Sequence, residues 1–254
     1  QQQGKSMKKT KIVCTLGPAS STEEVIEKML QAGMDVARFN FSHGTHEYHK
    51  ELMETFRRVR DRMKVPAAVM LDTKGPEVRI GEMGGGSATL VKGKPYVLTT
   101  ELIVGNEERA SISYKDFPTQ LSKGNRILMD DGRIILEVES TTKTEVLCRI
   151  VEGGVLKTHK SVNVPNVHLN MPYISPRDEA DLLFGIEMDV DFIAASFVRS
   201  AEDVIALRKF VDFHGGHHIR IISKIENIEG IQNFDEILRH SDGIMVARGD
   251  MGVE

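Results

Sequence analysis

Two apolar runs that end in charged side chains decide the fold: Ile221-Ile222-Ser223-Lys224-Ile225-Glu226 and Gly243-Ile244-Met245-Val246-Ala247-Arg248-Gly249-Asp250. We expect each run to form a strand. The segment between them carries apolar residues at the spacing of one helix face, namely Ile231, Phe234, Ile237 and Leu238. A strand, a short helix and a second strand predict a β-α-β unit, in which the two strands run parallel.

The charged residues at the ends of these runs predict a metal site. Residues two apart on a strand share a face, so Lys224 and Glu226 are expected to point the same way. Arg248 and Asp250 in the second run are likewise expected to share a face. Parallel strands open their carboxyl ends on one side, where Glu226 and Asp250 could share a hard cation such as magnesium with an anionic ligand beside Lys224. The alternative interpretation is that these charges are simply solvated.

Composition limits the class of protein. The chain has 254 residues, of which 40% are hydrophobic, and a formal net charge of -4, so it can bury a sizeable core and has no electrostatic signature of nucleic-acid binding. No apolar stretch approaches the length of a membrane span, so we expect no membrane partner and a cytoplasmic location. Cys14 and Cys148 have no paired spacing and are expected to be reduced. We interpret residues 1–6 as a non-native remnant ahead of Met7.

An all-β insert divides the chain. Residues 75–171 show short alternating runs separated by glycine-rich turn clusters, whereas strands and helices alternate on both sides of this segment. We therefore assign residues 7–74 and 172–254 to one barrel domain and residues 75–171 to a small inserted β-barrel domain. Besides the two runs quoted above, strands are predicted at residues 11–16, 35–42, 67–73 and 192–198.

These six strands predict an α/β fold of the (β/α)8 TIM-barrel type that is incomplete here. A closed barrel of this type needs eight strands. The first and sixth strands are then open edges with unpaired backbone groups, which recruit partners. We expect the isolated chain to self-associate or to bind a complementary fragment, and to have low activity alone.

The strand predicted at residues 35–42 has an unusual alternation. Phe39 and Phe41 fall on one face, and Arg38, Asn40 and Ser42 fall on the other. Polar groups that point into a sheet or barrel cost free energy unless they are partnered, so this face predicts a ligand. The alternative is an edge strand with a solvated face.

Five motifs in sequence order resemble the pyruvate kinase family. They are Cys14-Thr15-Leu16-Gly17-Pro18-Ala19-Ser20, Ala37-Arg38-Phe39-Asn40-Phe41-Ser42-His43-Gly44, Leu71-Asp72-Thr73-Lys74-Gly75-Pro76-Glu77, Ser223-Lys224-Ile225-Glu226-Asn227 and Met245-Val246-Ala247-Arg248-Gly249-Asp250. The resemblance spans residues 7–254 and includes the inserted β-domain. It implies a transferase of the last step of glycolysis, which moves the phosphoryl group of phosphoenolpyruvate to ADP and gives pyruvate and ATP.

The resemblance also implies roles for single residues. Arg38 would hold the substrate phosphate, and Lys224 would stabilise charge on the group in transfer. The substrate would lie against Gly249 and Asp250, and Glu226 with Asp250 would bind Mg²⁺ or Mn²⁺. Oxygens for K⁺ would come from Asn40, Ser42, Asp72 and Thr73. The set implied in nucleotide and cofactor binding is Asn40, His43, Arg79 and Lys160.

Two positions refine this picture. In the family a glutamate at the position of Glu77 accompanies dependence on potassium. After Lys160 this chain has Ser161, where the family usually has glycine.

The resemblance also implies a homo-oligomer, a tetramer in the family. Two other functions stay open, namely a magnesium-dependent aldolase or lyase that acts on a pyruvate enolate, and a catalytically silent fragment that binds substrate.

Overall fold

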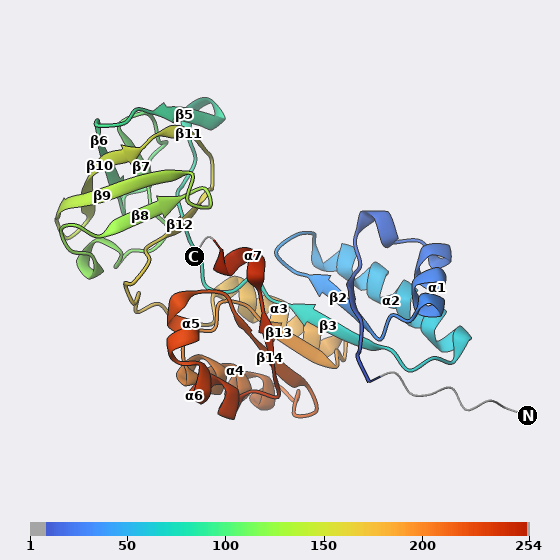
Figure 1. Ribbon diagram of the computed structural model, residues 1–254. Coiled ribbons are helices and arrows are strands. Elements are labelled where there is room, and N and C mark those ends of the chain that lie inside the picture. Colours follow the sequence, from blue (N-terminus) through green and yellow to red (C-terminus); the bar gives the residue numbers. More distant parts are fainter. Residues whose placement is uncertain (1–8, 253–254) are drawn as a thin grey trace, which may run out of the picture. The chain divides into compact units, whose positions relative to one another are not determined.

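The computed structural model describes residues 9–252, so the predicted remnant at residues 1–6 and the start at Met7 lie outside the described residues. The chain folds into two compact units (Figure 1). Within the described residues, the first comprises residues 9–75, Tyr173–Lys224 and Phe234–Met245, and the second comprises Pro76–Pro172, Ile225–Asn233 and residues 246–252. The second unit thus takes two short segments that we had assigned to the barrel domain, and the predicted domain limits stay a prediction.

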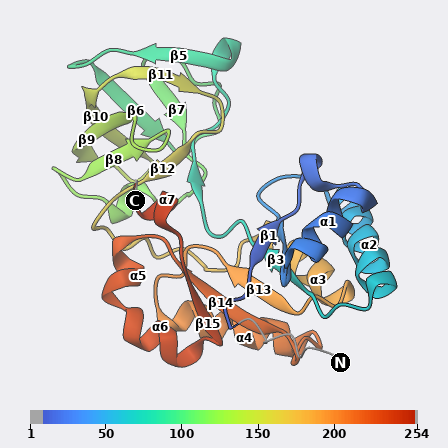
Figure 2. The ribbon, with the colours of Figure 1, turned by 45° about the vertical axis from the view of Figure 1, so that its right-hand side comes forward.

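A parallel sheet carries the βα part of the chain. Within residues 9–252 it has six strands in the order β1-β2-β3-β13-β14-β15 (Figure 1, Figure 2). Their bounds are Val13–Thr15, Val36–Asn40, Ala68–Asp72, Phe192–Ala195, Arg220–Ile225 and Gly243–Val246. The register of β2 on β3 places Asn40 opposite Asp72. β1 and β15 end this sheet, which confirms the two predicted edges for the part of the chain described.

The longer helices begin and end at the residues that local chemistry favours. They are α1 (Glu23–Ala32), α2 (His46–Met63), α3 (Pro176–Glu187) and α4 (Ala201–Phe213). Thr22 caps α1 by accepting the backbone N–H of Val25, and Gly33 ends the helix at a φ of 109°. No helix in residues 9–252 is long and apolar enough to cross a bilayer.

The last part of the chain differs from the prediction in two ways. The single helix expected before β15 is two short helices, α5 (Ile228–Gln232) and α6 (Phe234–His240), which meet at Asn233. The second strand also ends at Val246, and Arg248–Met251 forms a helical turn, α7. Arg248 and Asp250 are thus two residues apart on a helix, where successive residues turn by about 100°, and the shared strand face predicted for them was wrong.

The second unit is built mainly of strands, as expected. Its seven-stranded sheet has the order β4-β12-β8-β9-β10-β6-β7. The bounds in that order are Val78–Arg79, Ser161–Asn163, Arg126–Met129, Ile134–Thr141, Glu145–Glu152, Pro95–Thr99 and Arg109–Ser111, and β5 (Ser87–Leu90) pairs with β11 (Gly154–Lys157) apart from it. An antiparallel bridge between Ile80 and Ile112 joins the two ends of this order, so the sheet closes around a core that includes Tyr96, Phe117 and Leu136.

Candidate active site

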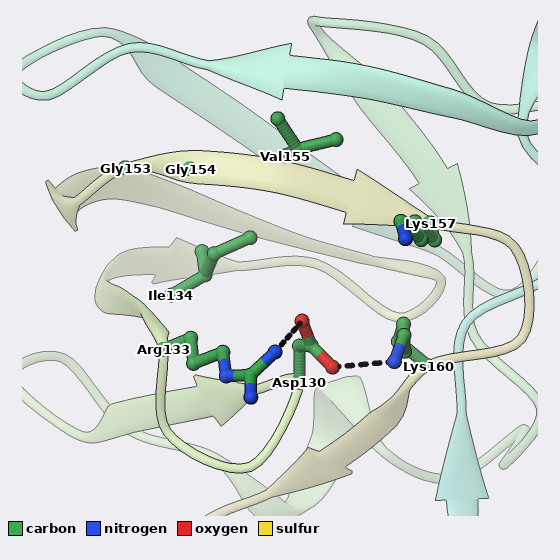
Figure 3. A pocket seen from close by; sticks show the side chains of 8 residues that line it. All are labelled: Asp130, Arg133, Ile134, Gly153, Gly154, Val155, Lys157 and Lys160. Carbon is green, nitrogen blue, oxygen red and sulfur yellow. Dashed lines mark ion pairs between the residues drawn. The ribbon is translucent and has the colours of Figure 1, made fainter.

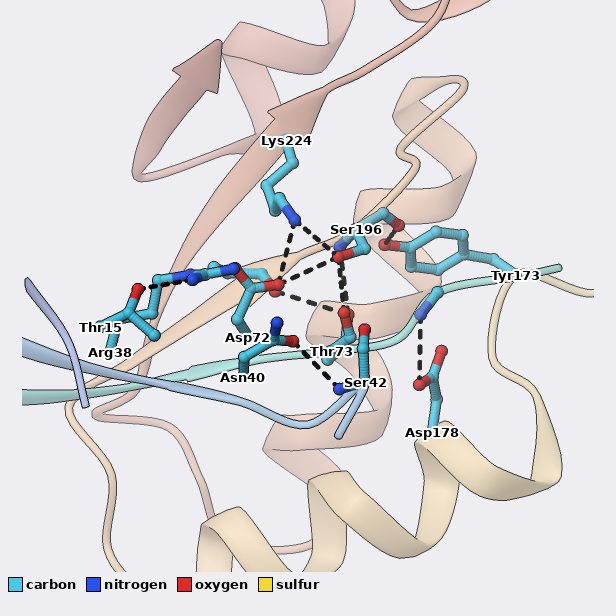
Figure 4. Close-up of polar contacts among 12 residues, drawn as sticks. Thr15, Arg38, Asn40, Ser42, Asp72, Thr73, Tyr173, Asp178, Ser196 and Lys224 are labelled. Carbon is cyan, nitrogen blue, oxygen red and sulfur yellow. Dashed lines mark hydrogen bonds and ion pairs between the residues drawn. The ribbon is translucent and has the colours of Figure 1, made fainter. Parts of the chain in front are cut away.

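A buried carboxylate, Asp72, is the centre of the candidate site at the carboxyl end of β3 (Figure 4). Its side chain is only 1% exposed, and two cations from other strands donate hydrogen bonds to it. Arg38 Nε lies 2.6 Å from Oδ2, and Lys224 Nζ lies 3.1 Å from Oδ1. A buried charge is costly unless it is paired and hydrogen-bonded, so both contacts offset the burial of Asp72 and hold the two cations in place.

Ser196 joins the same network, and the sequence analysis missed it. Its hydroxyl lies 3.0 Å from Lys224 Nζ, which donates to it, and 2.5 Å from the carbonyl oxygen of Thr73. Its backbone N–H donates to Thr73 Oγ1 at 3.1 Å. Ser196 directly follows β13, at the same edge of the sheet as Asp72. The available signal was a polar residue directly after an apolar run, because parallel α/β folds bind their ligands at the carboxyl ends of the strands.

Arg38 is fixed but still accessible. Besides its bond to Asp72, Nη1 donates to Thr15 Oγ1 at 2.6 Å, and 22% of its side chain is exposed. Lys224 is more enclosed, with 9% of its side chain exposed. Two cations held on one carboxylate, one of them reachable from solvent, are suited to binding an anion with several oxygens.

The polar face predicted for β2 is present. Phe39 and Phe41 are 0% and 2% exposed, while Asn40 and Ser42 lie with Asp72 and Thr73 in Figure 4. Asn40 Oδ1 accepts the backbone N–H of Ser42 at 3.1 Å. Amide, hydroxyl, carboxylate and carbonyl oxygens are hard ligands, so the chemistry of this donor set fits an alkali cation.

Glu226 and Asp250 differ in exposure. Glu226, which follows β14, is 1% exposed, whereas Asp250 lies on the exposed side of α7. No described atom lies within 4 Å of the position that a Cβ on Gly249 would occupy, so its backbone is open to close approach. In residues 9–252 no group of three or more histidine, cysteine or acidic side chains could hold a metal ion. Two carboxylates still fit magnesium, which commonly takes its other ligands from substrate and water.

The second unit contains two other predicted residues. Arg79 Nε and Nη2 donate to the Glu77 carboxylate at 2.8 and 2.9 Å. Lys160 Nζ lies 2.7 Å from Asp130 Oδ1, in a pocket of about 320 Å³ (Figure 3). Arg133 and Lys157 also line this pocket, so it holds three cations and one carboxylate. That balance favours an anionic ligand.

The predicted residues are therefore divided. The first unit brings together Arg38, Asn40, Ser42, Asp72, Thr73 and Lys224 (Figure 4). His43 belongs to the same unit, in the loop between β2 and α2. Glu226, Gly249 and Asp250 belong to the second unit, as do Arg79 and Lys160.

A parallel sheet with an inserted closed β unit, and with a polar cluster at the carboxyl ends of its strands, defines an α/β-barrel enzyme class. The family model described as "Pyruvate kinase, barrel domain" matches residues 7–254. The chain therefore belongs to the pyruvate kinase family.

Individual relatives agree with this assignment. A pyruvate kinase of Staphylococcus haemolyticus is 50% identical over 98% of this chain and 43% of its own length. A pyruvate kinase of Clostridium perfringens is 46% identical over 98% of this chain and 52% of its own length. The crystal structure of a pyruvate kinase from Cryptosporidium parvum superposes with a TM-score of 0.89 at 37% identity, covering 96% of this chain and 52% of that one. The chain thus spans about half the length of the relatives it matches.

Proposed function

We propose that this chain takes part in the transfer of a phosphoryl group from phosphoenolpyruvate to ADP, which gives pyruvate and ATP. The observation that carries the proposal is the double pairing of Asp72, 2.6 Å from Arg38 and 3.1 Å from Lys224. Phosphoryl transfer passes through a loose transition state, so positioning and electrostatic stabilisation provide most of the catalysis. Cations that are already fixed need no reorganisation when charge develops on the phosphoryl oxygens.

Arg38 and Lys224 have different parts in this proposal. Arg38, with its partly exposed guanidinium, binds the phosphate of the substrate through two or more N–H groups. Lys224, which is more enclosed, places a compact charge beside the group in transfer. Ser196 accepts a hydrogen bond from Lys224 at 3.0 Å and so limits the rotation of the ammonium group.

Glu226 and Asp250 are the proposed residues for magnesium or manganese, with the Gly249 backbone against the substrate. When bound, the metal supplies Lewis-acid polarisation of the enolpyruvate oxygens. Asn40, Ser42, Asp72 and Thr73 are the proposed residues for potassium, since their oxygens suit a cation that compensates an anionic substrate. Both ions are general to the family.

The nucleotide is proposed to contact His43, Arg79 and Lys160, with Asn40 nearby. The pocket of about 320 Å³ around Lys160 supports this part, because Arg133 and Lys157 add positive charge beside it. The Asp130 carboxylate holds Lys160 at 2.7 Å and keeps its ammonium group at the pocket. We further propose a cytoplasmic protein that assembles with copies of itself or with a complementary chain along the sheet edges β1 and β15.

A coupled assay tests the proposal. Lactate dehydrogenase and NADH report pyruvate, and we expect a signal only when magnesium, potassium, phosphoenolpyruvate and ADP are all present. Pyruvate released without ADP would favour the aldolase or lyase class instead. Calorimetry with magnesium and phosphoenolpyruvate tests the remaining alternative, a catalytically silent fragment. Binding of phosphoenolpyruvate without any turnover would identify such a fragment.

A further inference from the structure

His49 is bonded to the loop that leads from β2 into α2. From the first turn of α2 its Nε2 lies 2.7 Å from the carbonyl oxygen of His43. Its ring also stacks on Phe41, with centroids 4.1 Å apart and planes 12° from parallel. The residue is 3% exposed. A carbonyl oxygen only accepts, so Nε2 carries a proton and the ring is held by both a hydrogen bond and a stack.

The other ring nitrogen shows that this position is not simply apolar packing. Within the described residues Nδ1 of His49 is buried and has no hydrogen-bond partner. An unpaired buried polar atom costs free energy, and a phenylalanine would stack on Phe41 without that cost. The N–H donated to His43 is the feature that histidine adds here.

The loop that His49 holds carries oxygens proposed for potassium. The backbone N–H of Ser42 donates to Asn40 Oδ1 at 3.1 Å, and that of His43 donates to the Asn40 carbonyl at 3.3 Å. Gly44 follows at a φ of +82°, where an added Cβ would lie 3.1 Å from His49 Nε2. The loop is thus packed directly against the imidazole ring and has little room to shift.

We propose that His49 is a positioning residue whose hydrogen bond to the His43 carbonyl holds residues 40–43 in the conformation that presents Asn40 and Ser42 to a monovalent cation. This inference rests on the proposed function for the identity of the cation. His49 itself contacts neither substrate nor ion in this account. It acts through the backbone of the loop.

Matched variants separate the hydrogen bond from the packing. His49→Gln keeps an N–H donor near the Nε2 position, whereas His49→Phe keeps the aromatic stack and removes the donor. His49→Met is a second variant without a donor, in case the phenylalanine prevents folding. The control is His214→Phe, since His214 Nδ1 lies 2.9 Å from the Phe210 carbonyl at an exposed position directly after α4.

Amide hydrogen exchange of residues 41–45 tests the positioning itself. We expect exchange about tenfold faster in the donor-free variants, because one hydrogen bond no longer closes the loop, and little change in His49→Gln and His214→Phe. Unchanged exchange in both donor-free variants would overturn the inference. Equally fast exchange in His49→Gln would also overturn it, since packing alone would then explain the effect.

Thermal unfolding in KCl and in NaCl of equal ionic strength tests the use of the loop. Potassium is expected to raise the midpoint of the wild type, His49→Gln and His214→Phe more than that of the donor-free variants. A potassium shift that persists in the donor-free variants would contradict the inference. Potassium could leave the unfolding midpoint of every variant unchanged while amide exchange is still faster in the donor-free variants. In that case the proposed cation is wrong, and the conclusion that His49 holds the loop stands.

Discussion

Asp178 accepts a hydrogen bond from the backbone N–H of Gly75, with its Oδ1 3.3 Å from that nitrogen. The two residues are 103 positions apart in the sequence and join the first turn of α3 to the segment that follows β3. Gly75 has a φ of +82°, and a Cβ there would lie 2.9 Å from Ser196 Cβ. This bond therefore holds the turn beyond Asp72 and Thr73 on a backbone that only glycine adopts easily.

The burial of Asp178 predicts a pH-dependent stability. Desolvation, together with the nearby Asp181, raises the pKa of Asp178 from 3.8 to about 6. The folded chain then binds this proton more tightly than the unfolded chain does, so its stability falls as the pH rises from about 4 to 6. Asp178→Asn keeps an acceptor for Gly75 without the charge. We expect it to raise the free energy of unfolding at pH 7 by up to about 3 kcal/mol, from 1.36 kcal/mol per pKa unit, and by little at pH 4.

Denaturant unfolding at the two pH values checks this prediction. The control is Glu179→Gln, a neighbouring exposed acid on the same helical turn. A variant that is less stable than the wild type at pH 7 but not at pH 4 would mean that the charged form of Asp178 is required, contrary to this account.

Asp72 provides a second prediction. Replacing it with asparagine removes the negative charge between Arg38 and Lys224 and leaves the enclosed lysine without its counter-charge. We expect a loss of about 3 kcal/mol in the free energy of unfolding, as for other broken buried ion pairs. Asp61→Asn is the matched exposed case, because Asp61 pairs with Arg60 at 2.8 Å while 68% of its side chain is exposed. That change is expected to cost below about 1 kcal/mol, and equal losses in the two variants would refute the special role of Asp72.

The third prediction concerns the divalent ion. Glu226→Gln and Asp250→Asn each remove one charge from the proposed magnesium site, and we expect either to abolish the magnesium-dependent part of phosphoenolpyruvate binding while the fold is kept. Calorimetry with and without magnesium measures this, with circular dichroism for the fold. Glu236→Gln, which changes an exposed acid on α6, is the control. Binding that keeps its full magnesium dependence in both variants would show that the ion sits elsewhere.

The fourth prediction concerns the monovalent ion. Glu77 is held by Arg79, at 2.8 and 2.9 Å, and an acid near an anionic substrate calls for a compensating cation. Glu77→Lys supplies that positive charge covalently and should weaken the need for potassium, although it also loses the pair with Arg79. The measurement is pyruvate formation as a function of potassium concentration, for the unchanged chain and for Glu77→Lys. Full activity of the unchanged chain in potassium-free buffer would contradict the prediction.

The sequence predicted best what depends on local periodicity. Alternation alone placed Phe39 and Phe41 on one face and Asn40 and Ser42 on the other, because a strand repeats every two residues, and the structure buries the two phenylalanines. Position at a strand end likewise identified Lys224 and Glu226, whereas Asp72 was named from the resemblance to the family.

The rest depends on contacts that a linear pattern does not contain. The predicted strand up to Asp250 was too long, because β15 ends at Val246 and Asp250 lies in the helical turn that follows. The longer strand was suggested only by the spacing of Arg248 and Asp250, which are two residues apart. Asp178 stands in the first turn of α3, where acidic residues are common. Its hydrogen bond to Gly75, far away in the sequence, is a product of the fold.

The central claim is that Arg38 and Lys224, held by one carboxylate, bind the phosphate of phosphoenolpyruvate. Calorimetric titration of the chain with phosphoenolpyruvate and magnesium tests this directly when Arg38→Met and Lys224→Met are compared with Arg58→Met, whose side chain is 60% exposed and pairs with Glu23. We predict that each of the first two variants weakens binding at least tenfold, as expected for a charge-assisted hydrogen bond, and that Arg58→Met binds like the wild type. Unchanged affinity in both Arg38→Met and Lys224→Met would contradict the account.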